Sequence, residues 1–101
     1  MKKFIVSYKG KKIIIDNYFF CDSLFSQMRG LMFRSKKFKT PLVFRFNKPV
    51  SLAIHSLFVN FKFRAIWLRD GKAIDIQTVK PYQLYIKSKG KFDTLIEIPI
   101  I

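Results

Sequence analysis

The stretch FRAIWLRDGKAIDIQ, residues 63–77, decides the fold class of this chain. Two runs that alternate apolar and polar side chains flank Asp70-Gly71, a dipeptide that is typical of two-residue type I′ turns. Alternation with a period of two indicates strands with one buried face. The pattern therefore predicts a β-hairpin in which Arg69 pairs with Lys72.

The register of this hairpin predicts what each face carries. Successive pairs place Trp67 opposite Ile74 on an apolar face. The remaining side chains occupy the opposite face: Arg64, Ile66, Asp75 and Gln77. Arg64 and Asp75 are then diagonal neighbours that can form an ion pair. We therefore expect Asp75 to point away from the apolar face.

Short apolar runs separated by turn residues continue along the rest of the chain. Lys9-Gly10 divides KKFIVSY from KKIIIDNYFF and predicts a second hairpin. Further strand candidates are residues 40–46, 51–59, 83–86 and 93–100. Together these segments predict a mainly β protein, a small single-domain sandwich or barrel of about seven or eight mostly antiparallel strands.

One segment departs from the β pattern. Residues 22–32 place apolar side chains at helical spacing, and Asp22 or Ser23 can cap the first turn. Gly30 falls where such a helix ends in left-handed backbone, and Arg29 in the last turn complements the helix dipole. We expect one short helix near residues 22–30.

Chain length, hydrophobic content and cysteine count predict the size of the domain and its compartment. A chain of 101 residues, half of them hydrophobic, is expected to form a single domain over residues 1–101. Its one cysteine, Cys21, has no disulfide partner within the chain, which favours a reducing compartment; a buried apolar role and a reactive thiol are its two interpretations. No apolar run approaches the length of a membrane span or of a signal peptide. We expect a cytoplasmic protein.

The charge is strongly unbalanced, with 20 basic residues, 6 acidic residues and a net charge of +14. No acidic residue occurs between Ser23 and Arg69. Such a field attracts nucleic acid, anionic lipid or phosphorylated ligands. A solvated cationic surface without a partner is the simpler alternative, and composition alone does not decide between the two.

Two basic stretches, RSKKFK (34–39) and KSKGK (87–91), are expected to be surface loops with nucleic-acid-binding potential. The candidate contacts are Arg34, Lys36, Lys37, Phe38, Lys39, Lys87, Lys89 and Lys91. Phe38 and Tyr82 are candidate stacking platforms for unpaired bases. The alternative is that Phe38 anchors its loop and the lysines are only solvated.

His55 is the single histidine, a residue type that titrates near neutral pH, and is the candidate catalytic base or ligand contact. A strand histidine bonded to the backbone is the alternative interpretation. One His, one Cys and scattered carboxyl groups predict neither a metal site nor a cofactor.

Several motifs taken together resemble one family. They are RGLMFR (29–34), PLVFRF (41–46), SLAIHSLFVNFKFRAIWLRDGKAIDI (51–76), VKPY (79–82) and LIEIP (95–99). Their order and spacing resemble the domain of unknown function 192 family, most closely its short archaeal members, over about Asp22 to Pro99. The resemblance implies a small, mainly β sandwich or barrel with the Arg-Gly-Leu-Met segment as its short helix, and it implies no reaction. Family members commonly carry Asp where this chain has Arg64, so a ligand site using that acid would be absent or inverted in charge here.

Three expectations about function follow, and whether the protein is an enzyme stays open. The first is a non-enzymatic module that binds a polyanion, RNA or single-stranded nucleic acid. The second is a small anionic-ligand site or enzyme around His55 and Arg29, with Ser56 and Asn60 as further ligand contacts. The third is protein–protein association through the apolar stretch SLFVNF, residues 56–61.

Overall fold

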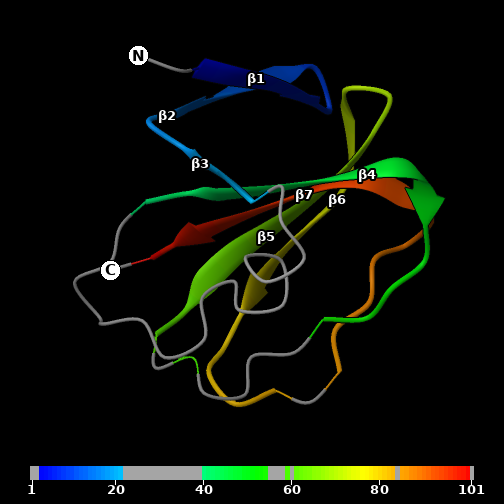
Figure 1. The fold of residues 1–101 in the computed structure, drawn as a ribbon. Coiled ribbons are helices and arrows are strands. Elements are labelled where there is room, and N and C mark those ends of the chain that lie inside the picture. Colours follow the sequence, from blue (N-terminus) through cyan, green and yellow to red (C-terminus); the bar gives the residue numbers. More distant parts are fainter. Residues whose placement is uncertain (1–2, 22–39, 55–58, 60, 84, 101) are drawn as a thin grey trace.

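The computed structural model describes residues 3–21, 40–54, 59, 61–83 and 85–100. Its strands are β1 (Lys3–Tyr8), β2 (Lys11–Asp16), β3 (Phe19–Cys21), β4 (Leu42–Val50), β5 (Phe63–Arg69), β6 (Lys72–Val79) and β7 (Phe92–Pro99). They form one seven-stranded sheet in the order β2-β1-β6-β5-β7-β4-β3 (Figure 1). The mainly β fold class is confirmed, as a single curled sheet.

The sheet is mixed, because β1 pairs with β6 and β3 pairs with β4 in parallel. The other neighbouring pairs are antiparallel. The sheet curls so that the β1–β2 hairpin lies over one face of the central strands (Figure 1). β2 and β3 are consecutive in sequence and occupy the two edges of the sheet.

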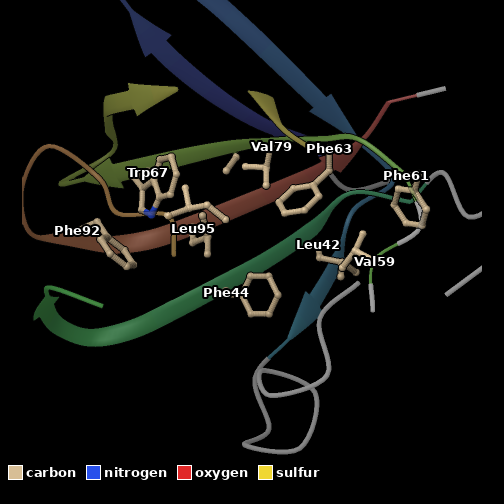
Figure 2. Packing of buried hydrophobic residues seen from close by; sticks show 11 residues of the cluster. Leu42, Phe44, Val59, Phe61, Phe63, Trp67, Val79, Phe92 and Leu95 are labelled. Atoms are coloured by element: carbon tan, nitrogen blue, oxygen red, sulfur yellow. The ribbon is translucent and has the colours of Figure 1, made fainter. Parts of the chain in front are cut away.

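Each face of the sheet carries its own buried cluster, and we name the faces by these clusters. The hairpin face buries Val6, Ile15, Val43, Ile66, Leu68 and Ile96. The aromatic face buries Leu42, Phe44, Val59, Phe61, Phe63, Ala65, Trp67, Val79, Ile86, Phe92 and Leu95 (Figure 2). Because both faces are covered, β5 is buried at four successive residues, Ala65 to Leu68, and does not alternate.

Both predicted hairpins are confirmed. Lys9 and Gly10 have φ values of 49° and 78°, and Asp70 and Gly71 have φ values of 52° and 80°. Positive φ at both central residues is the signature of the type I′ turn, whose twist matches that of the flanking strands. Each turn therefore fixes the register of the first pairs beside it, Tyr8 with Lys11 and Arg69 with Lys72.

The register predicted for the rest of the β5–β6 hairpin is wrong. Leu68 pairs with Ala73, but the next pair is Trp67 with Asp75, because a β-bulge inserts Ile74 without a partner. Asp75 consequently lies on the aromatic face, where it is 4% exposed. Arg64 is exposed on the opposite face and pairs with Thr78, so the expected ion pair with Asp75 does not form.

Three other predicted elements lie wholly or partly outside the described residues. The helix expected near residues 22–30 lies outside the described residues, and the described part of the chain contains no helix. The strand candidates 51–59 and 83–86 contribute an isolated antiparallel bridge between Ile54 and Ile86. Within these described ranges, no helix is long and apolar enough to cross a membrane.

Candidate functional site

The basic loop, residues 85–91, is held by backbone bonds to Ile54 and by a side chain of β6. Ile86 is buried, and its backbone N–H and C=O both bond to Ile54 with N–O distances of 2.8 Å. Its neighbours Tyr85 and Lys87 point outward, and Tyr85 is 68% exposed. Burial of one side chain therefore orients the chain so that the aromatic and basic groups on either side face solvent.

A side-chain network from β6 fixes the same loop. The Gln77 Nε2 group donates to the Lys87 carbonyl oxygen at 3.0 Å and to Asp75 Oδ2 at 2.9 Å. These two bonds use both N–H donors of the amide. Further along the loop, the Ser88 hydroxyl donates to the Gly90 carbonyl oxygen at 2.6 Å. The buried Asp75 thus acts through Gln77 to position Lys87.

The three lysines predicted on this loop, Lys87, Lys89 and Lys91, are all exposed. Tyr82, the predicted stacking residue, is 61% exposed and precedes the loop. Tyr85 adds a second exposed ring that sequence reasoning missed. The loop therefore combines three exposed lysines with the exposed ring of Tyr85. Proteins that bind single-stranded nucleic acid use basic groups for the phosphates and aromatic rings for the bases.

Glu97 is a second feature that sequence reasoning missed. It lies in β7 on the aromatic face, opposite Ala65 of β5 and Leu42 of β4, and is 7% exposed. Desolvation by this burial raises the pKa of its carboxyl group from 4.5 to about 8, so the group is mostly protonated at neutral pH. The formal net charge of +14 counts Glu97 as −1, and protonation makes it +15. The detectable signal was a lone acid in the apolar run LIEIPI.

Trp67 contributes an unusual polar atom to the same face. Its indole Nε1 is buried and has no hydrogen-bond partner. The residue pairs with Asp75 on one side and Leu95 on the other. Asp75, Trp67 and Glu97 are therefore buried polar residues on the aromatic face.

A cleft of about 370 Å³ opens at the end of the sheet where the β5–β6 turn meets the bulged part of β4. Its lining residues are Arg45, Phe46, Asn47, Lys48, Pro49, Asp70, Gly71, Asp93 and Thr94. The Arg45 guanidinium lies 5.6 Å from the centre of the Phe20 ring. Among the described residues, no group of three or more His, Cys, Asp or Glu side chains could hold a metal ion.

Most of the other predicted site residues lie outside the described part of the chain. They are Arg29, Arg34, Lys36, Lys37, Phe38, Lys39, His55, Ser56 and Asn60. The Cys21 side chain is likewise not described. The structure therefore places only Lys87, Lys89 and Lys91 of the predicted contacts, and it brings these three together on one loop.

Solved structures share the fold of this chain. A protein of unknown function from Novosphingobium aromaticivorans matches with a TM-score of 0.79 and 17% identity, over 96% of this chain and 71% of its own. A candidate transcription regulator from Sinorhizobium meliloti matches with a TM-score of 0.79 and 14% identity, over 96% of this chain and 78% of its own. At these identities the likeness concerns the fold alone.

Comparison by sequence gives the family. No curated protein matches the chain. The family model of the domain of unknown function 192 (DUF192), described as Uncharacterized ACR, matches residues 7–100. Since this match spans nearly the whole chain, the protein belongs to the DUF192 family.

Proposed function

We propose that this protein is a non-enzymatic module that binds single-stranded nucleic acid, with RNA as the ligand to test. The observation that supports the proposal is the basic loop, in which three exposed lysines accompany the exposed ring of Tyr85 on a backbone held by Ile54 and Gln77. A loop held in place loses less conformational entropy on binding than a free chain of the same composition.

The distribution of acidic residues adds to this electrostatic argument. Of the described acids, Asp75 and Glu97 are buried, so an approaching polyanion does not contact their carboxyl groups. Asp16 and Asp70 are exposed and Asp93 is partly exposed, against a chain total of 20 basic residues. Phosphate contacts would supply most of the affinity, and stacking on Tyr85 would be tolerant of sequence.

Fluorescence anisotropy with labelled single-stranded RNA, from about 50 to 200 mM salt, tests the proposal. Each lysine–phosphate contact on a single strand contributes about 0.7 to the slope of log affinity against log salt. The triple variant Lys87/Lys89/Lys91→Gln is therefore expected to lower the magnitude of this slope by about 2 and to weaken binding at low salt. Tyr85→Leu is expected to weaken binding without changing the slope, because it removes stacking and no charge.

The matched control is Lys11/Lys12/Lys62→Gln, which removes the same charge from exposed positions on β2 and beside β5. Its salt slope is expected to stay close to that of the wild type. An equal decrease in affinity and in salt slope in both triple variants would show that only net charge matters, which contradicts a defined loop site. Binding that is lost in His55→Ala and kept in the loop variant would favour the small-ligand alternative. The proposal fits a cytoplasmic location, where RNA is an abundant polyanion.

A further inference from the structure

The cleft at the end of the sheet has two walls of different origin. One wall is the irregular part of β4 from Arg45 to Pro49, where the pairing with β7 shifts between Arg45 and Val50. The other wall comes from the Asp70-Gly71 turn and the start of β7. Lys91 of the basic loop directly precedes β7 and is two residues from Asp93 in the cleft, a span of about 7 Å at most. The cleft is therefore within reach of a nucleic-acid strand that contacts Lys91.

The charges in this cleft differ from those on the rest of the surface. Arg45 and Lys48 are balanced by Asp70 and Asp93, so the lining is formally neutral. Of the three described acids that are not buried, only Asp16 lies elsewhere. A site that held phosphate alone would be weakened by two carboxylates, because like charges repel. Carboxylates in this place instead suit a ligand that also presents hydrogen-bond donors.

Asp93 is already oriented to accept such donors. Its Oδ2 accepts from the Asp70 backbone N–H at 2.9 Å, and its Oδ1 accepts from the Thr94 hydroxyl at 2.9 Å. Each carboxylate oxygen has a second lone pair, so both oxygens can accept one more bond. The carboxylate is thus held in one orientation without being saturated.

We propose that this cleft reads a base of the bound single strand and prefers bases that carry an exocyclic amino group. This inference rests on the proposed function. A carboxylate accepts from the amino group of cytosine, whereas uracil presents a carbonyl oxygen at the same position and would be repelled. Arg45 and Lys48 hold the adjoining phosphate, and the cleft volume of about 370 Å³ is large enough for one base.

The test compares labelled C8 and U8 RNA, which differ at this position by amino group against carbonyl. We expect the wild-type protein to bind C8 about tenfold more tightly than U8, the discrimination of one good base contact. Asp70→Asn and Asp93→Asn are expected to reduce this ratio at least threefold while U8 binding stays the same or improves. Asp70→Asn keeps the backbone N–H that donates to Asp93, so it tests base discrimination by the cleft even if Asp93→Asn disturbs the turn.

Asp16→Asn is the control, because it removes an exposed acid from the end of β2, outside the cleft. The C8 to U8 ratio should not change in this variant. Equal binding of C8 and U8 by the wild-type protein, or an unchanged ratio in both cleft variants, overturns the inference and leaves the proposed function standing. Failure to bind either strand at low salt overturns the proposed function, and the inference with it.

Discussion

The buried carboxyl of Glu97 should make the protein less stable as the pH rises, and Glu97→Gln should remove this effect. In the unfolded chain the group ionises near pH 4.5, and in the folded protein burial raises its pKa to about 8. Between these two values the folded state binds a proton that the unfolded state has released, so stability falls with rising pH by about 1.4 kcal/mol per pH unit. From pH 4.5 to pH 7 the loss is about 3 kcal/mol, and the loss is complete above pH 8.

Urea denaturation of both proteins at intervals from pH 4 to pH 8 measures this difference. Glutamine stays neutral, so we expect the variant to match the wild-type protein near pH 4.5 and to be more stable by about 3 kcal/mol at pH 7. Taking the difference between the two proteins cancels the other titrating groups. A difference that is flat with pH, or a variant that is less stable at pH 7, would refute the assignment of Glu97 as a desolvated neutral acid.

Further outcomes concern the loop network and the turns. Gln77→Leu leaves the buried Asp75 carboxyl without its amide donor, so it should destabilise the fold by about 1–3 kcal/mol in urea denaturation. In the same variant the Ile86 amide should exchange its hydrogen faster, because the neighbouring Lys87 carbonyl loses its bond to β6. Gly71→Ala should cost about 1 kcal/mol by thermal unfolding, since φ is +80° and no atom obstructs an added Cβ. Gly90→Ala, which has an equally open Cβ position without positive φ, should be neutral or stabilising by up to about 1 kcal/mol, and a larger cost would contradict the conformational argument.

The two turns were predictable from their own residue types. The β-bulge in β6, just beyond the Asp70-Gly71 turn, was not predictable. Asp70-Gly71 carries its conformation in its own residue types. Ala73 and Ile74 are both apolar, so the pattern of β6 reads equally well with or without an extra residue. The side of the sheet on which Asp75 lies depends on that one insertion, because a shift of one residue exchanges the two faces.

Among the candidate site residues, too, some were predictable from the sequence and others were not. The basic loop was predictable because its lysines are close together in the sequence, and loops of small β domains lie on the surface. The burial of Glu97 was not predictable. β7 lies between β5 and β4 with both faces covered, and alternation of side chains then gives no indication of which ones are exposed. The network from Asp75 to Lys87 joins a strand to a loop that returns to it, and no local pattern encodes such a contact.

The position of β7 in the sheet has a consequence for the order of assembly during synthesis. β7 is translated after β4 and β5, yet it lies between them and is the only described strand that pairs with both. Until β7 emerges from the ribosome, the nascent chain can form the β1–β2 and β5–β6 hairpins, but β4 and β5 each keep an open backbone edge and apolar side chains that have no partner. A chain whose translation stops before Phe92 would therefore be a substrate for chaperones and proteases, and not a smaller folded domain.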